Sequence, residues 1–170
     1  MRTPLPRPSS GHHRGRVLFV TSKFPRWEGD NTTPFVLHLA QDLQALGWRI
    51  LVLAPHAKGA KLHEYLQGVE VRRFRYWWPL SGQTVCYSGG ALVNLRRRRI
   101  DLVKLPALLV AELWASLLQL ARRDIDIVHS HWILPQGLVA GIAATVSRTP
   151  HIATIHGGDV FALRGAFFAR

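Results

Sequence analysis

Short apolar runs alternate with amphipathic segments along most of the chain, a pattern typical of a parallel sheet with helical crossovers. The run VLFVT is almost entirely apolar, which predicts a strand buried on both faces. The run VEVRRF alternates, which predicts a strand with one wetter face near an edge of the sheet. Five runs are expected to be strands: residues 17–21, 50–53, 69–74, 125–128 and 152–155.

A helix is expected after the first of these strands. Thr33 is placed as its N-cap, Pro34 fits its first position, and Gly47 is placed to end it. Its apolar residues recur on one face, namely Phe35, Val36, Leu39, Leu43 and Leu46. Residues 135–146 also have helical spacing, and the apolar residues on one side there are Leu138, Ile142 and Val146.

A long apolar segment, residues 100–121, follows four consecutive arginines, Arg96, Arg97, Arg98 and Arg99. At helical spacing its polar residues share one arc, namely Lys104, Glu112, Ser116, Gln119 and Arg123. We expect a helix packed against the sheet. The alternatives are a helix lying on an anionic leaflet, anchored by the arginines, and a membrane span, which Lys104, Pro106 and Glu112 would interrupt.

The order of these elements predicts a doubly wound, Rossmann-like α/β domain. Its last two strands and the helix between them form a βαβ unit, and each strand ends in a polar cluster. The clusters are His129-Ser130-His131-Trp132 and His156-Gly157-Gly158-Asp159. In open parallel sheets, ligands bind beyond the carboxyl ends of the strands. The two clusters therefore predict a binding site at that edge.

The composition limits the class of partner. The chain has 170 residues, enough for a core, and a net charge of +12, which favours a phosphate-bearing partner such as a nucleotide-linked substrate, an anionic lipid or a nucleic acid. The single cysteine, Cys86, excludes a disulfide framework and predicts a reduced, cytoplasmic location. Residues 1–15 are expected to be a flexible basic tail with no secretory signal.

The loop before the first helix is a candidate for phosphate contact. A helix N-terminus can hold an anion such as a diphosphate, and Gly29, Asn31 and Thr32 would let the backbone approach one. The loop lacks the G-x-G-x-x-G fingerprint, so a plain capped helix is the alternative. A second loop carries Tyr76-Trp77-Trp78, which fits a sugar-stacking platform, a membrane-interface patch or a plug over the core.

Residues 16–170 resemble the N-terminal domain of the GT-B glycosyltransferases, in particular the large retaining family numbered four. The motifs that carry the resemblance, in chain order, are Lys23-Phe24-Pro25, Gly29-Asp30 before Phe35-Val36, Gly47-Trp48, Leu53-Ala54-Pro55, Asn94-Leu95-Arg96, His129-Ser130-His131-Trp132 with Pro135 and Gly137, and Thr154-Ile155-His156-Gly157-Gly158-Asp159. The last two are the most specific.

The resemblance implies transfer of a sugar from a nucleotide diphosphate sugar to a glycan or lipid-linked acceptor, with retention of configuration and without a metal or other cofactor. His156 would face the donor sugar, and it and the neighbouring Asp159 would be the catalytic residues. Gly157 and Gly158 would let the backbone approach the donor diphosphate, as Gly29, Asn31 and Thr32 would. His129, His131 and Trp132 would lie on the acceptor side. The second, nucleotide-binding domain of such enzymes is absent from this sequence, so the chain alone is expected to be inactive.

Three other readings are open. A zinc site could use His129, His131, His151, His156 and Asp159, although neither a fixed spacing motif nor a cysteine pair supports it. Nucleic acid could bind the basic segments, but their arginines do not interleave with aromatics in a recognised motif. The third reading is a non-catalytic module of the same fold that attaches to anionic membrane, on the inner face, or to a partner subunit.

Overall fold

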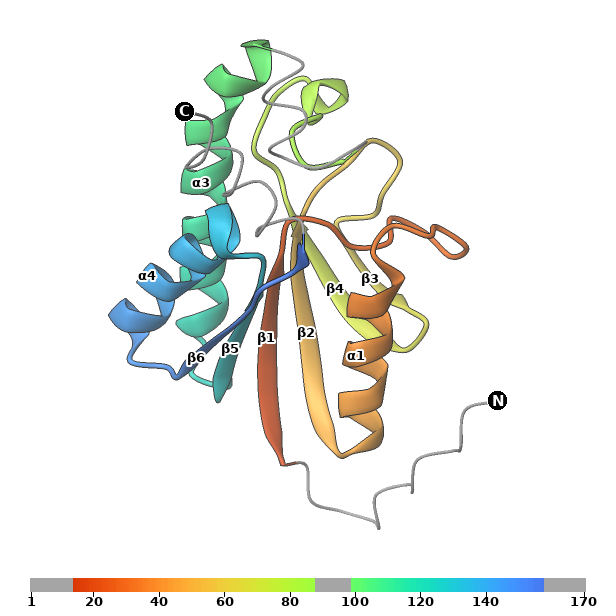
Figure 1. Ribbon diagram of the computed structural model, residues 1–170, viewed down its shortest axis with the longest axis vertical. Coiled ribbons are helices and arrows are strands. Elements are labelled where there is room, and N and C mark those ends of the chain that lie inside the picture. The colour runs from red at the N-terminus through yellow and green to blue at the C-terminus, as the bar shows by residue number, and fades with distance from the viewer. Residues whose placement is uncertain (1–13, 88–98, 158–170) are drawn as a thin grey trace.

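The structure is a computed structural model that describes residues 14–87 and 99–157 (Figure 1). Six strands form one sheet in the order β3-β4-β2-β1-β5-β6, and all neighbours are parallel except β3 and β4. The strands are β1 (Gly15–Thr21), β2 (Trp48–Pro55), β3 (His63–Leu66), β4 (Val69–Phe74), β5 (Ile127–His131) and β6 (His151–Thr154). This arrangement confirms the predicted Rossmann-like α/β fold.

Helices cover both faces of the sheet. Helix α1 (Pro34–Ala45) packs on one face, while α3 (Arg99–Leu120) and α4 (Leu138–Ser147) lie side by side on the other (Figure 1). Successive residues of a strand point to opposite faces, so β1 serves both layers: Phe19 packs with α1, and Leu18 packs with α3 and α4. Two short turns, η1 (Leu80–Gly82) and η2 (Ile133–Gly137), connect these elements.

The edge strand β3 was not predicted from the sequence. Its residues, His63-Glu64-Tyr65-Leu66, are mostly polar or exposed and form no apolar run. The available signal was the two-residue connection Gln67-Gly68, whose φ angles of 48° and 85° are those of a tight hairpin turn. Strand β4 is therefore one position in from the edge of the sheet, because β3 pairs with its outer side. Its alternating residues are buried and half-buried in turn over most of the strand.

The start of α1 differs from the expected cap. Pro34 is its first residue and Gly47 follows its end with a left-handed φ of 93°, as predicted. Thr33, however, makes no capping hydrogen bond; its hydroxyl donates to the Lys23 carbonyl instead, at 3.1 Å. Phe35 was placed on the apolar face, but it is 47% exposed, because Val36, Leu37 and Ala40 face the sheet.

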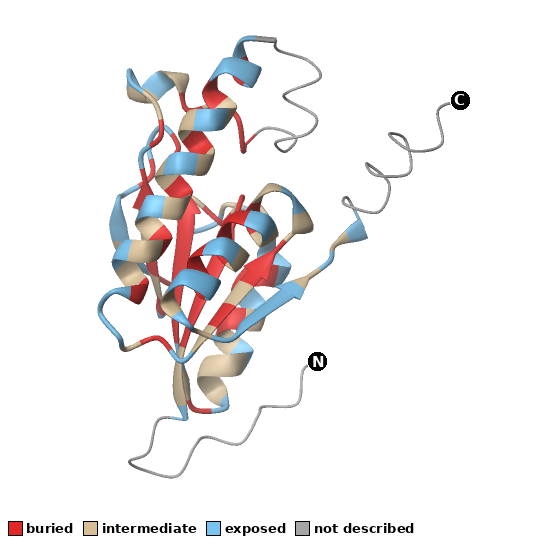
Figure 2. Cartoon of the chain, turned by 90° about the vertical axis from the view of Figure 1, so that its left-hand side faces the viewer, coloured by how far each residue is buried: buried red, intermediate tan, exposed pale blue. Residues whose placement is uncertain are grey.

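Helix α3 has its polar arc inside and its apolar arc outside. Asp101, Lys104, Glu112 and Ser116 are all buried, whereas the opposite arc is exposed in Figure 2. The three ionisable groups have partners, since the Lys104 amine lies 2.9 Å from the Asp101 carboxylate and Glu112 accepts a hydrogen bond from a buried glutamine of η2. The Ser116 hydroxyl has none among the described residues. The same buried side also carries leucines: Leu108 and Leu120 lie in the core, and Leu105, Leu113 and Leu117 pack against it. Helix α3 therefore packs against the sheet, as predicted, while its outer side is apolar as well.

Helix α4 also exposes its large apolar residues. The side predicted from helical spacing, Leu138, Ile142 and Val146, is 46–68% exposed. The buried positions hold Val139 and three alanines, Ala140, Ala143 and Ala144. Small side chains at these positions allow α4 to lie close to the sheet and to α3.

The aromatic loop after β4 is mainly a plug over the core. Tyr76 is buried, and its hydroxyl oxygen accepts a hydrogen bond from the Val85 backbone N–H at 3.0 Å. Trp77 packs against the same cluster, while Trp78 is 84% exposed. The motif Asn94-Leu95-Arg96 and the side chains of Arg96, Arg97, Arg98 and Arg99 lie outside the described part of the structure.

Candidate functional site

The predicted site lies where the direction of strand addition reverses. The chain builds outward from β1 through β2 to β4, and then returns to the other side of β1 with β5 and β6. At this switch point Thr21 of β1 pairs with His131 of β5, and His131 pairs with Thr154 of β6. Three carboxyl ends are thus aligned, which is where open α/β sheets bind ligands.

The first polar cluster belongs to β5 itself and does not follow it. Residues 125–128 were expected to be the strand, but β5 runs from Ile127 to His131, because the backbone continues to pair with β1 and β6 up to His131. His129 and His131 therefore project from the same face of the sheet, with their rings stacked at 4.5 Å.

His156 completes a stacked row of three histidines. Its ring lies nearly parallel to that of His131, 5.5 Å away between centroids, and the His131 Nδ1 is 3.2 Å from the His156 Nε2. Phe19 meets both histidines of β5 edge-on at 4.8–4.9 Å. The structure therefore brings together the predicted donor-side histidine and the predicted acceptor-side histidines.

An aromatic wall surrounds His156. The rings of Trp132 and Phe35 lie 4.7 Å and 4.9 Å from the His156 ring, and 6.2 Å from each other. Phe35 is a site residue that the sequence analysis missed, because its position in the helical pattern assigned it to the core. Phe35 points away from the core and towards His156, so the N-terminus of α1 lies beside the histidine row.

The backbone at Trp132 fixes this wall. Trp132 has a left-handed φ of 73°, an uncommon conformation for a bulky residue. It is held there by two hydrogen bonds at 3.0 Å: its N–H donates to the Thr154 carbonyl, and its carbonyl accepts from the Gly137 N–H. A Cβ at Gly137 would lie 3.0 Å from the Trp132 carbonyl oxygen, so a larger residue there would have to displace this oxygen by a few tenths of an ångström.

Burial disfavours the charged form of the two β5 histidines, His129 and His131. Desolvation lowers the pKa of His131 to about 3, and the neighbouring His129 and His156 contribute in the same direction. The pKa of His129 is also lowered, first by burial. The His129 ring is anchored by the neighbouring strand, since its Nε2 is 2.7 Å from the Thr154 hydroxyl of β6. These two rings are therefore neutral imidazoles near pH 7, each with one nitrogen that donates and one that accepts.

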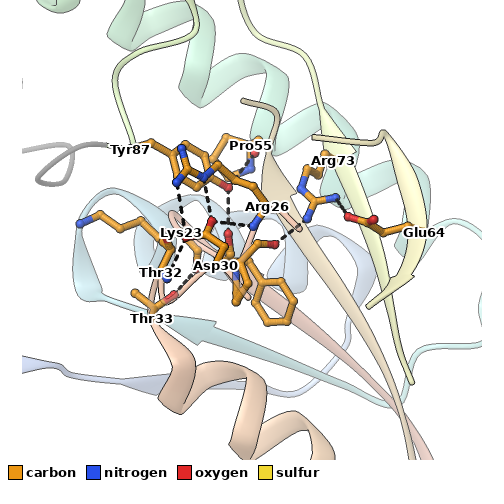
Figure 3. A network of polar contacts seen from close by, with 11 residues as sticks. Lys23, Arg26, Asp30, Thr32, Thr33, Pro55, Glu64, Arg73 and Tyr87 are labelled. Atoms are coloured by element: carbon orange, nitrogen blue, oxygen red, sulfur yellow. Dashed lines mark hydrogen bonds and ion pairs between the residues drawn. The ribbon is translucent and has the colours of Figure 1, made fainter. Parts of the chain in front are cut away.

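The loop before α1 is closed by Asp30 (Figure 3). Its carboxylate accepts hydrogen bonds from the backbone N–H and guanidinium of Arg26, at 2.9 and 2.7 Å, and from the Thr32 hydroxyl at 2.8 Å. Burial alone would raise the pKa of Asp30, but these hydrogen bonds outweigh it and hold the pKa well below its usual range. Asp30 is therefore an ionised clamp within the loop.

Of the three residues expected to approach a diphosphate, two lie on the loop surface. Gly29 has a φ of 83° and nothing within 4 Å of the position of a Cβ, and Asn31 is exposed. Thr32 differs, because its backbone N–H already donates to Asp30 at 3.2 Å. Phe35 connects this loop end to the histidine row through its contact with His156.

Arg73 and Tyr87 hold the same loop from behind. The Arg73 guanidinium donates to the Pro25 carbonyl at 2.7 Å, and the Tyr87 hydroxyl lies 3.3 Å from the Phe24 carbonyl (Figure 3). Lys23 adds a half-buried amine to this edge, and burial lowers its pKa. From the sequence, Lys23 was assigned only to a turn motif. The proximity of its loop to the switch point depends on the order of the strands in the sheet, which the local sequence does not show.

Four further residues were named from the sequence: Gly157, Gly158, Asp159 and His151. Gly157 is exposed at the end of the described chain, while Gly158 and Asp159 lie outside it. His151 does not join the histidine row but lies on the opposite face of β6, where its Nε2 is 2.9 Å from the Ser130 hydroxyl. Within residues 14–87 and 99–157, no group of three or more histidines, cysteines or acids is arranged to hold a metal ion.

Comparison with known proteins gives one family match. The profile of Glycosyltransferase Family 4 matches residues 33–169, most of the chain. A protein of Methanocaldococcus jannaschii described as an uncharacterized glycosyltransferase is 39% identical over 46 residues, which span 27% of this chain and 13% of that protein.

Solved structures give only weak similarity. Two crystal structures of the C-terminal domain of a hydrogenase from Pyrococcus furiosus cover 90% and 89% of this chain and all of theirs, with TM-scores of 0.46 and 0.44. Each is 12% identical to this chain, and neither bears on its function.

Proposed function

The chain belongs to glycosyltransferase family 4, and from this premise we propose that it is the acceptor-side half of an enzyme that transfers a sugar from a nucleotide diphosphate sugar to a glycan or lipid-linked acceptor. The observation that supports this most directly is the row of His129, His131 and His156 at the switch point of the sheet. It supplies hydrogen-bonding groups and an aromatic wall at the sheet edge where open α/β folds bind ligands.

In this proposal His156 donates a hydrogen bond to a donor-sugar hydroxyl or to a phosphate oxygen, and His131 positions it. The two rings lie 3.2 Å apart between nitrogens, so a proton on one fixes the tautomer of the other. Trp132 and Phe35 offer ring faces against which a sugar can stack. Gly157, Gly158 and Asp159 follow His156 in the chain and are assigned to the same side.

The leaving group sets the electrostatic requirement. A diphosphate leaves with its negative charge, so transfer with retention depends on stabilising that charge more than on a strong nucleophile. The N-terminus of the twelve-residue helix α1, with Gly29 and Asn31 on the loop before it, can supply backbone N–H groups to the diphosphate. No metal or cofactor is assigned to the reaction.

The family architecture assigns the nucleotide to a second domain. We therefore expect the 170-residue chain to show little or no transfer on its own, and to become active when that domain, in the same or another polypeptide, closes over the histidine row. Binding of the acceptor is assigned to this half, with the half-buried His129 and Trp132 on the acceptor side; His131, assigned to the same side from the sequence, is fully buried and can only position its neighbours.

The test is an assay of donor consumption with the protein purified from its source cells by an antibody against this chain. It is incubated with uridine, guanosine and adenosine diphosphate sugars and with a cell extract as the acceptor source. We expect one donor to be consumed and NMR of the product to show the anomeric configuration of that donor. Consumption of none, an inverted product, or full activity of the isolated 170-residue chain would contradict the proposal.

A further inference from the structure

The outer surface of α3 is a continuous apolar stripe along the helix. It consists of Val103, Pro106, Val110, Trp114 and Leu118, spaced three or four residues apart and therefore on one side. Val103, Val110 and Trp114 are 63–67% exposed, and Leu118 is 48% exposed. Single exposed apolar residues are ordinary on a protein surface, but a row of this length is not.

The stripe carries no charge because the helix turns its ionisable groups inward. Residues 100–121 contain only three such groups, Asp101, Lys104 and Glu112, and all three are buried. Burying charged or polar groups is costly unless they are paired, and the opposite orientation would put the apolar residues in the core. The outward side is thus left with apolar side chains, although the inward side carries leucines as well, and this face suits an apolar environment.

A second apolar row lies beside the stripe. Leu138, Ile142 and Val146 are exposed on α4, which packs against α3 on the same side of the sheet, and both outer faces appear together in Figure 2. The two rows thus form one apolar face of the molecule.

Basic residues border this apolar face at its far end. Arg122 and Arg123 are exposed directly after α3, and Arg148 is exposed directly after α4. Before α3 the sequence has further arginines, and the chain as a whole has a net charge of +12. Two copies packed through this face would bring like charges together, whereas an anionic lipid surface would neutralise them.

We propose that this apolar face rests on an anionic membrane, with α3 lying along the lipid interface and the flanking arginines on the headgroups. None of the described helices is long and apolar enough to cross a bilayer. The N-terminal part of α3 rises above the carboxyl edge of the sheet, so the bound surface would extend past the histidine row (Figure 1). The inference goes beyond the transfer reaction and does not depend on it.

Co-sedimentation with lipid vesicles tests this inference on the 170-residue chain. The chain is mixed with vesicles of phosphatidylcholine alone, and with vesicles that also contain phosphatidylglycerol. We expect binding only to the anionic vesicles, decreasing as salt is raised. The double variant Val110→Asp/Trp114→Asp should reduce the partition coefficient at least about tenfold, because two apolar side chains no longer enter the interface.

The matched control is Tyr65→Asp, which places the same charge at an aromatic that is 70% exposed on β3, at the opposite edge of the sheet. This variant should bind as the unmodified chain does, and circular dichroism should show that all variants are folded. Absence of binding to anionic vesicles, or equal binding by the double variant, would overturn the inference. So would a solution dimer that the double variant disrupts without any vesicle binding, which would assign the face to a second copy.

Discussion

Replacing Arg73 with methionine should lower the free energy of unfolding by about 3–5 kcal/mol, the usual effect of removing one partner of a buried charged pair. The Arg73 side chain is fully buried and donates to the Glu64 carboxylate at 2.5 Å, and to the Lys61 and Pro25 carbonyls at 2.7 Å. Methionine fills similar space but leaves all three acceptors without this donor. Urea denaturation at neutral pH measures the loss.

Arg72→Met is the matched control. Arg72 is the adjacent residue on β4, but it is partly exposed and pairs with Glu70 at 3.0 Å, so its loss should cost less than about 1 kcal/mol. The double variant Arg73→Met/Glu64→Met should recover part of the stability, because it removes the stranded carboxylate as well. Equal effects of the two single variants would show that Arg73 does not hold the loop before α1 as described.

Replacing Glu112 with glutamine should stabilise the protein by about 3–5 kcal/mol at pH 8 and by less than about 1 kcal/mol at pH 5. Burial raises the pKa of Glu112 to about 8 from an unfolded value of 4.5, and the hydrogen bond from Gln136 only partly offsets it. Below pH 4.5 Glu112 is protonated in both the folded and the unfolded protein, so its burial does not lower the free energy of unfolding through ionisation. Above pH 4.5 Glu112 ionises in the unfolded chain but stays protonated in the folded protein. The free energy of unfolding therefore falls as the pH rises towards 8.

The control for Glu112 is Ser116→Ala, one turn further along the same buried side of α3. Serine does not ionise in this range, so its effect on the free energy of unfolding should be the same at pH 5 and pH 8. If Glu112→Gln also changed the free energy of unfolding equally at pH 5 and pH 8, the pKa of Glu112 would be the same in the folded and unfolded protein. Glu112 would then be ionised in the folded protein at neutral pH. The inward orientation of the polar arc of α3 would then be wrong.

Much of the fold could be predicted because parallel strands buried on both faces are continuous apolar runs. The apolar runs at β1 and β2 predicted two central strands, and helical spacing of apolar residues predicted α1 and α4. The meeting of His129, His131 and His156 followed from the sequence as well, since carboxyl ends of neighbouring parallel strands share one edge. Neither prediction required knowledge of side-chain packing.

Other features depend on tertiary pairing that the sequence does not display. A helical wheel divides α3 into polar and apolar arcs and places Lys104 beside Asp101, but only the folded protein shows that these groups lie inside and that Glu112 meets Gln136. Likewise, Phe35 fits an apolar helical face, and its actual contact with His156 arises from the sheet order. Strand β3 forms because its backbone pairs with β4, not because its side chains are apolar.

The central claim is that the histidine row belongs to a sugar-transfer site, and turnover of the His156→Ala variant tests it most directly. The substitution is made at the gene in the source cells, and the protein is purified and assayed for nucleotide diphosphate release. We predict a fall in kcat of about 10²–10³-fold, as expected on losing a hydrogen-bond donor to developing charge. The control His38→Ala, at an exposed position on α1, should keep full activity. Turnover of His156→Ala equal to that of the unmodified protein would contradict the account.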